Sequence, residues 1–220
     1  MRVKSRVQFI DSLDEQSASR KRELITLKSL LKECNRDHEQ QTLRRSCIVL
    51  AYAHWEGFIK DASITYVEYV DNQSLQLKQM SINFQAIACR SLIQNASKAT
   101  KKISPHLNLF RQILINSSEK LRVNSEIAID TESNLDATVF QNICMVVGVD
   151  YDSTWHTKRA FINDMVKRRC SIAHGEIGQP LDDKYVLEVI DFVIEAIDGF
   201  KTDLENAVVN ANYRKIYDNI

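Results

Sequence analysis

Glycine and proline are scarce in this sequence, with 5 Gly and 2 Pro among 220 residues. Because both residues interrupt helices and shape turns, their scarcity argues against a fold of many short strands and favours long uninterrupted helices. The composition, 44% hydrophobic and 26% charged, is ordinary for a globular protein. A chain of this length buries a sizeable core without disulfides or metals. We therefore expect a single all-α domain over residues 1–220.

Several features of secreted and membrane proteins are missing as well. The 5 cysteines are odd in number and widely spaced, with no Cys-x-x-Cys pair, which argues against a disulfide framework or a structural zinc site. No stretch approaches the roughly 18 apolar residues that a membrane-spanning helix needs. The first residues also lack the continuous apolar segment of a signal peptide. We expect a cytoplasmic protein that does not associate with a membrane.

The chain has no excess of either charge, since 29 Lys and Arg balance 29 Asp and Glu. This balance excludes the global basic field that drives non-specific binding to nucleic acid. Any contact with RNA must therefore use a local basic patch. Four patches are present, and we interpret the first three as solvated helix faces: residues 20–22, 44–45, 98–102 and 167–169.

Apolar residues recur at helical spacing along most of the chain. We expect a bundle in which the two longest helices pack antiparallel. The first segment is one helix or two helices broken around Gln16 and Ser17. Residues 116–134 are polar and poorly periodic, which predicts a mobile loop or insertion. The expected helices cover residues 7–34, 40–70, 84–100, 106–115, 136–147 (with a strand as the minor alternative) and 158–174, and a last one follows the N-cap Asp182.

Arg169 and His174 have side chains suited to phosphodiester chemistry. Histidine exchanges protons near neutral pH, and the arginine fork matches the oxygens of a phosphate. The 2′-hydroxyl of RNA is an internal nucleophile, so cleavage with these groups needs no metal. On an ideal helix, however, positions five apart are separated by about 140°, so the two side chains do not share a face. Acid–base catalysis also needs two proton-shuttling groups, and the motif supplies one histidine. A two-fold homodimer answers both objections, because it presents each residue twice. The plain alternative is that His174 caps a helix end and Arg169 is a surface charge.

Three runs of the sequence carry a family resemblance. RRCSIAHGE, residues 168–176, resembles the R-x4-6-H signature of HEPN domains. LAYAHWEGFIK, residues 50–60, and ESNLDATVFQNICMVVGVD, residues 132–150, are similar to segments of the MAE_28990/MAE_18760 family of HEPN-like nucleases. The resemblance implies a HEPN-like helical bundle that acts as a homodimeric, metal-independent endoribonuclease. Proteins of this kind often belong to toxin–antitoxin or anti-phage defence systems.

The resemblance also assigns roles to residues. It makes Arg169 and His174 the catalytic pair, and we interpret Arg168 and Lys167 as ancillary contacts to RNA phosphates. The motif also fits if it starts at Arg168, but we favour Arg169. Cys170 follows Arg169 where HEPN nucleases frequently carry Asn, Asp or His, and a thiol is a weak hydrogen-bonding group. We do not expect Cys170 to be a nucleophile.

Glu56, in the Trp-Glu-Gly run, is the third candidate catalytic residue. It is interpreted either as a general base or orienter of His174, or as the structural partner of a nearby arginine. Trp55 and His54 are expected in the core. The remaining histidines have no neighbour at metal-ligand spacing, so we expect no metal and no other cofactor: His38, His106 and His156.

Two functions from different classes follow. The leading hypothesis is an endoribonuclease that cleaves RNA, with tRNA among the candidate substrates, through attack of the 2′-hydroxyl on the adjacent phosphate. An antitoxin or a defence-system protein would then be its partner. The alternative is a non-catalytic HEPN scaffold that binds a protein or a nucleic acid, which the neutral charge and Cys170 favour.

Overall fold

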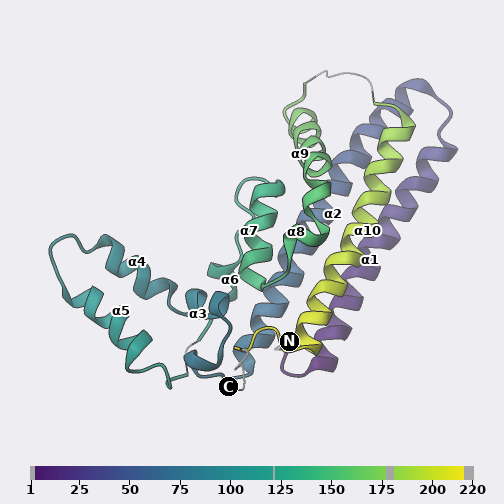
Figure 1. The fold of residues 1–220 in the computed structure, drawn as a ribbon. Coiled ribbons are helices and arrows are strands. Elements are labelled where there is room, and N and C mark those ends of the chain that lie inside the picture. The colour runs from purple at the N-terminus through teal and green to yellow at the C-terminus, as the bar shows by residue number, and fades with distance from the viewer. Residues whose placement is uncertain (1–2, 121, 177–180, 216–220) are drawn as a thin grey trace.

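The computed structural model describes residues 3–120, 122–176 and 181–215. Three long helices form its centre (Figure 1): α1 (Arg6–Glu33), α2 (Asp37–Asn72) and α10 (Asp183–Val209). Ion pairs between Lys21 and Asp198 and between Lys201 and Asp14 show that α1 runs antiparallel to α10. Polar contacts described below show the same relation between α1 and α2. The prediction of an all-α bundle whose two longest helices are antiparallel is confirmed.

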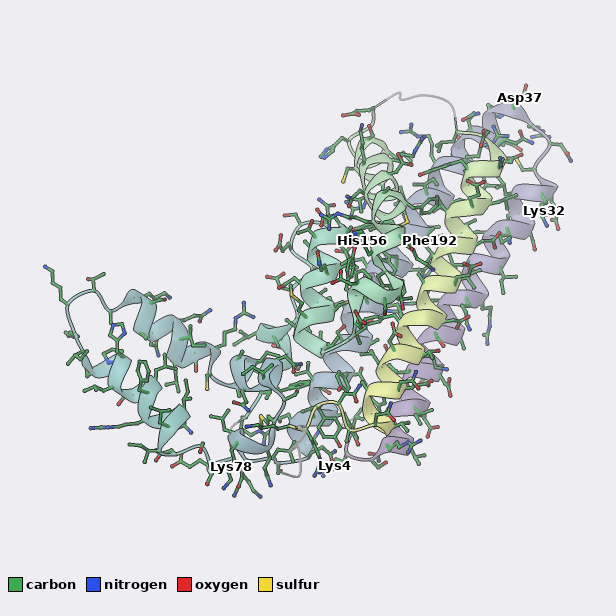
Figure 2. The ribbon with its side chains drawn as sticks, viewed as in Figure 1. Lys4, Lys32, Asp37, Lys78, His156 and Phe192 are labelled. Atoms are coloured by element: carbon green, nitrogen blue, oxygen red, sulfur yellow. The ribbon has the colours of Figure 1, made fainter. Side chains whose placement is uncertain are left out.

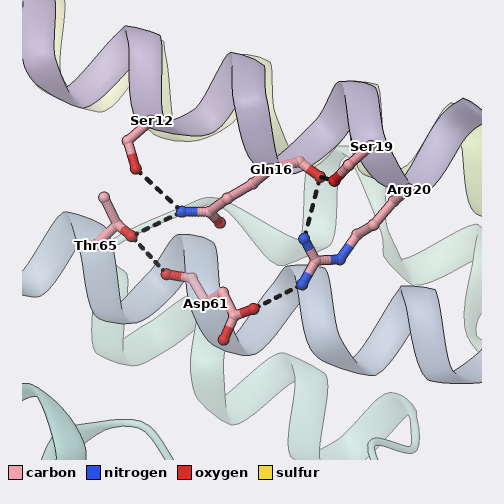
Figure 3. A network of polar contacts seen from close by, with 6 residues as sticks. All are labelled: Ser12, Gln16, Ser19, Arg20, Asp61 and Thr65. Atoms are coloured by element: carbon pink, nitrogen blue, oxygen red, sulfur yellow. Dashed lines mark hydrogen bonds and ion pairs between the residues drawn. The ribbon is translucent and has the colours of Figure 1, made fainter.

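The first helix is continuous through the point where a break was one alternative. Gln16 donates a hydrogen bond to Thr65 Oγ1 on α2 at 3.1 Å, and Ser17 is buried. Arg20, one turn further, pairs with Asp61 at 2.6 Å (Figure 3). The Gln16 amide N–H thus bonds across to α2, and the Ser17 hydroxyl donates to the Asp14 carbonyl within α1, so both side chains have donor partners in an unbroken helix.

Two of the three residues in the Trp-Glu-Gly run of α2 have a role in packing. Trp55 is fully buried, as predicted, and its ring packs edge-on against Phe140 at a centroid distance of 4.8 Å. Gly57 leaves room for Arg20, because a Cβ at this position would lie 3.3 Å from the Arg20 guanidinium. Only Glu56 of the run is left for a role at the surface.

Shorter helices cover one side of the bundle and position the functional segment. α7 (Ala137–Val147) and α9 (Arg159–Ala173) both pack on α2. Trp155, in the connection between them, packs on Phe140 and lies beside Gly199 of α10, which has no side chain to obstruct it. The connection contains α8 (Tyr151–Thr154) and η2 (His156–Lys158). Residues 136–147, for which a strand was the minor alternative, are helical from Ala137 to Val147 after the N-cap Asp136.

Local signals at the helix ends agree with the sequence. The Asp182 carboxylate accepts a hydrogen bond from the Tyr185 backbone N–H, so its predicted role as N-cap of α10 is confirmed. Gly175 follows α9 with a φ of 74°, the left-handed conformation that favours glycine. These two residues fix where α9 ends and α10 begins.

The helix expected over residues 84–100 is wrong as a single element. It consists of α3 (Ile82–Ala88) and α4 (Arg90–Lys98), which meet at the buried Cys89, whose φ of −88° and ψ of 0° interrupt the regular helix. η1 (Leu77–Gln79) precedes α3, and α5 (Ser104–Leu114) packs on α4. Figure 1 shows α4 and α5 as a hairpin that stands away from the three long helices.

Residues 116–134, predicted as a loop or insertion, contain the short helix α6 (Ser125–Ala128). Val123 and Ile129 are buried, and the Asp71 carboxylate accepts the Val123 N–H at 2.8 Å. The last residues of this segment therefore lie against α2. In the part of the chain that the structure describes, no helix is long and apolar enough to cross a membrane.

Candidate functional site

The Arg169 side chain lies between α9, α2 and the segment that precedes α7. Its Nη1 donates a hydrogen bond to Asn134 Oδ1 at 2.8 Å. Its Nη2 lies 3.7 Å from Glu56 Oε2, and its guanidinium carbon lies 4.1 Å from the centre of the Tyr52 ring. The guanidinium is therefore held by an amide, a carboxylate and an aromatic ring before any substrate is present.

Glu56 and Arg169 form a partly shielded ion pair. Their side chains are 24% and 23% exposed, so the charges interact through less water than a pair on the open surface. The separation of 3.7 Å is at the long end for such a contact. Of the two interpretations of Glu56, this geometry fits the one in which Glu56 is the structural partner of a nearby arginine.

Tyr52 and Asn134 belong to this site but were not identified from the sequence. Tyr52 is buried one helical turn before Glu56, and its hydroxyl accepts a hydrogen bond from the Leu135 backbone N–H at 2.7 Å. Burial raises the pKa of Tyr52 to about 12, so the phenol stays neutral. The i, i+4 spacing of Tyr52 and Glu56 is the sequence signal for this pairing. Asn134 lies in the run 132–150 that carries the family resemblance, but its partners are distant along the chain and no local spacing pointed to it.

Cys170 contacts the same amide. Its thiol donates to Asn134 Oδ1 at 3.3 Å, and its sulfur lies 3.7 Å from Arg169 Nη1. The side chain is half-buried. At the position where HEPN nucleases frequently carry a more polar residue, this chain therefore has a thiol that helps to orient Asn134.

Arg168 points to the other side of α9. Its Nε pairs with Asp164 at 2.9 Å, and its guanidinium carbon lies 4.2 Å from the centre of the Tyr185 ring on α10. Burial alone would raise the pKa of Asp164, but hydrogen bonds from Tyr185 and Arg168 outweigh it and hold that pKa below its ordinary value. Lys167 is exposed and forms no ion pair within the described residues. Arg168 and Arg169 thus occupy two separate clusters.

His174 follows the last residue of α9 and is exposed. Its backbone N–H donates to the Cys170 carbonyl at 3.0 Å, and no described side chain forms a hydrogen bond or ion pair with its imidazole. Arg45 of α2 holds this helix end by donating to the Ile172 carbonyl at 3.4 Å and the Glu176 carbonyl at 3.0 Å. A single chain therefore fixes the backbone at His174 but brings its imidazole to neither Arg169 nor Glu56.

A surface hollow of about 500 Å³ lies where α2 meets the end of α9. It borders the segment that carries His174, and its lining combines apolar side chains with one guanidinium. The lining residues are Thr42, Arg45, Ser46, Val49, Leu50 and Ile172.

The remaining histidines lie apart from this site. His54 is half-buried, with Nε2 3.2 Å from the Glu23 carboxylate on α1, and burial lowers the pKa of His54. It is therefore a core-edge residue and not a fully buried one. His106 lies 3.1 Å from the Ala99 carbonyl, and His38 and His156 are exposed. Among the described residues, no group of three or more His, Cys, Asp and Glu is arranged to hold a metal ion.

Comparison with known proteins identifies the family. The sequence matches the RiboL-PSP-HEPN family over residues 15–206, which includes α2, α9 and α10 almost completely. No curated protein and no solved structure matches the chain. The HEPN resemblance is confirmed, whereas the narrower MAE_28990/MAE_18760 assignment stays a prediction. The chain belongs to the RiboL-PSP-HEPN family.

Proposed function

We propose that this protein is a metal-independent endoribonuclease that acts as a homodimer. The observation that carries the proposal is that one helix presents two groups suited to this chemistry, the oriented guanidinium of Arg169 and, at its C-terminal end, the exposed imidazole of His174. RNA supplies the nucleophile, so the protein must provide a base, an acid and a cation for the phosphate. These two residues supply those groups when two copies face each other.

In the proposed reaction, the 2′-oxygen of RNA attacks the adjacent phosphorus while His174 of one copy takes the hydroxyl proton. The phosphorus–O5′ bond breaks as the second copy's imidazolium gives its proton to the departing oxygen. The products are a 2′,3′-cyclic phosphate and a 5′-hydroxyl. No atom is oxidised or reduced, and each histidine returns to its starting state after the cyclic product is released and a proton is exchanged with water.

Arg169 stabilises the negative charge that grows on the phosphate oxygens. Its orientation is set in advance by Asn134 and by the Tyr52 ring, so little conformational entropy is lost when the phosphate binds. Glu56 holds the same guanidinium from the other side and acts as a positioning residue. Lys167, exposed on α9, contacts a flanking phosphate. Arg168 also binds an RNA phosphate, but only when its ion pair with Asp164 is broken.

The biological role is proposed from the RNA-cleaving activity. An enzyme that cuts RNA, including tRNA, inside its own cell needs a partner that restrains it. A role as a toxin or an anti-phage defence component, with an antitoxin or a defence protein as that partner, satisfies this need. The free thiols of all five cysteines suit a reducing cytoplasm.

The second candidate function is a non-catalytic HEPN scaffold. The observation that favours it is that Arg169 is already paired with Glu56 and Asn134, whereas no described carboxylate orients His174. In this alternative, the hollow beside Ile172 binds a segment of a partner protein.

Cleavage of total RNA and of tRNA in EDTA separates the two functions. We expect wild-type protein to cut RNA with cyclic-phosphate ends, and His174→Ala and Arg169→Ala to be inactive yet folded. His156→Ala, which removes an exposed histidine just before α9, at the end of that helix opposite His174, is the matched control and should cut normally. If His174→Ala cuts as fast as wild type, the mechanism is wrong. If wild type leaves every RNA intact, the scaffold function is supported instead.

A further inference from the structure

The α4–α5 hairpin exposes an apolar stripe that its own fold does not cover. Four large, apolar and exposed residues lie on one side of α5 and its N-cap: Ile103 at 68%, Leu107 at 46%, Phe110 at 60% and Leu114 at 71%. They recur at helical spacing, within about 60° of arc on an ideal helix. Scattered exposed apolar residues are normal, but an aligned row indicates a contact surface.

Among the described residues, α5 packs extensively on α4 alone, and the stripe faces away from that helix. The less exposed positions of α5 include Pro105, Leu109 and Gln112, which lie on the side opposite the stripe and face α4. Figures 1 and 2 show the hairpin and its side chains standing off the three long helices. The stripe therefore has no covering element among the described residues of its own chain.

The charged residues of the hairpin are all of one sign. Residues 90–114, here called the arm, carry 5 Lys or Arg and no Asp or Glu. Three of these charges, Lys98, Lys101 and Lys102, are exposed at the turn between α4 and α5. None of the arm's basic residues forms an ion pair with a described residue. In a chain of zero net charge, the arm is a concentrated basic element.

A segment of opposite charge follows the arm in the sequence. Residues 123–154, here called the acidic face, carry 6 Asp or Glu and no Lys or Arg. They include α6, α7 and α8. Glu126, Asp130 and Asp152 are among its exposed carboxylates, and none of its acidic residues forms an ion pair with a described residue. The face also exposes two large apolar side chains, Ile127 at 54% and Met145 at 59%.

We propose that the arm of one copy of this chain docks on the acidic face of a second copy. The contact covers the apolar stripe and pairs two sets of charges that the single chain leaves unpaired. Opposite charge selects this partner surface and its orientation. Around a two-fold axis the same contact forms twice, so the stabilisation is doubled. This interaction does not depend on RNA cleavage and goes beyond the proposed activity.

Charge reversal on each surface tests the proposal, with molar mass measured by light scattering or sedimentation over a concentration series. Lys101→Glu with Lys102→Glu reverses the arm, and Glu126→Lys with Asp130→Lys reverses the face. Each double variant alone should dimerise at least about tenfold more weakly than wild type. An equimolar mixture of the two should regain the dimer, because each reversed surface then meets its complement. Lys32→Glu, an exposed α1 lysine, is the control and should dimerise normally.

The apolar part of the contact is tested separately. Leu107→Glu should weaken the dimer without changing the helical circular dichroism, since the side chain is exposed in the single chain. Ile25→Glu, an exposed apolar position on α1, should have no effect. A monomeric wild type, or a dimer that both arm variants leave intact, overturns the proposal. If wild type is monomeric and binds anionic lipid vesicles in a way that Leu107→Glu abolishes, the stripe serves a membrane surface and the proposal is wrong. A monomeric wild type would also contradict the homodimer that the nuclease proposal requires, whereas a dimer that both arm variants leave intact overturns the arm contact alone.

Discussion

The Arg169 guanidinium lies over the Tyr52 ring, with 4.1 Å between the guanidinium carbon and the ring centre. A cation placed over an aromatic face gains about 0.5–2 kcal/mol, depending on how far water is excluded. The ring itself cannot move easily, because it is buried and its hydroxyl is hydrogen-bonded to the Leu135 backbone. One buried tyrosine thus connects the motif arginine on α9 to both α2 and the start of α7.

Replacing Tyr52 separates its two contacts. Tyr52→Phe keeps the ring under Arg169 but leaves the Leu135 N–H without its acceptor, so we expect a loss of about 1–3 kcal/mol in the free energy of unfolding. RNA cleavage by the folded fraction should stay close to wild type. Tyr52→Leu also removes the aromatic face and should lower cleavage as well as stability. Urea unfolding and the EDTA cleavage assay measure the two effects. A Tyr52→Phe protein as stable as wild type would contradict the assigned hydrogen bond.

Asn134 tests whether the orientation of Arg169 matters to the proposed reaction. Its amide oxygen accepts from both Arg169 and Cys170, and alanine removes that acceptor. Misplacing a reacting group by about 1 Å costs up to roughly hundredfold in rate, so Asn134→Ala should lower kcat by about tenfold to hundredfold, with a smaller change in KM.

The conservative variant and a neighbour provide the controls for Asn134. Asn134→Asp keeps an acceptor toward the guanidinium and should recover most of the rate. Ser133→Ala changes an exposed adjacent residue and should have no effect. If Asn134→Ala cleaves RNA at the wild-type rate, Asn134 does not position Arg169 for catalysis.

Gly199 gives a prediction about packing alone. A Cβ at this α10 position would lie 3.4 Å from Trp155, which is an ordinary van der Waals distance. Gly199→Ala should therefore be tolerated and should stabilise the helix by about 0.5–1 kcal/mol, because glycine is a poor helix former. Gly199→Leu has no room beside the indole and should destabilise by about 1–3 kcal/mol. Thermal unfolding of both variants tests this, and equal stability of Ala and Leu would show that Trp155 does not limit the space.

Local patterns in the sequence were sufficient for the long helices and for the start of α10. The apolar spacing around Trp55 and the cap at Asp182 both depend on neighbours within one or two turns. The break at Cys89 and the cluster around Arg169 could not be found this way. Cys89 interrupts a helix because it is buried where the chain turns away from the bundle, and Asn134 meets Arg169 only through the tertiary fold. Periodicity reports which face of a helix is buried, but not which distant side chain that face meets.

For Asp203 we predict that wild type and an uncharged variant differ in stability by an amount that depends on pH. Its carboxylate accepts a hydrogen bond from the Trp155 indole at 3.0 Å. Burial nevertheless raises the pKa of Asp203 above its ordinary value, with Trp155 opposing the shift and the Asp150 charge adding to it. A carboxyl whose pKa is higher in the folded state is held more easily in its neutral form. The ionised carboxylate therefore lowers the free energy of unfolding at neutral pH, and this cost disappears below the ordinary carboxyl pKa.

Asp203→Asn keeps an oxygen acceptor for the indole and removes the charge. We expect the variant to be more stable than wild type at neutral pH, by about 1 kcal/mol or less because the side chain is still partly in contact with water. The difference should shrink as the pH falls through the raised pKa of Asp203 and should vanish once the carboxyl is protonated in both states. Asn206→Gln, at an exposed position on the same helix, changes no titratable group and is the matched control, so it should show no such trend. Urea unfolding of the three proteins over a pH series decides the matter. A benefit of Asp203→Asn that grows toward low pH would mean that the buried carboxylate is stabilised by its partners and not penalised by its burial.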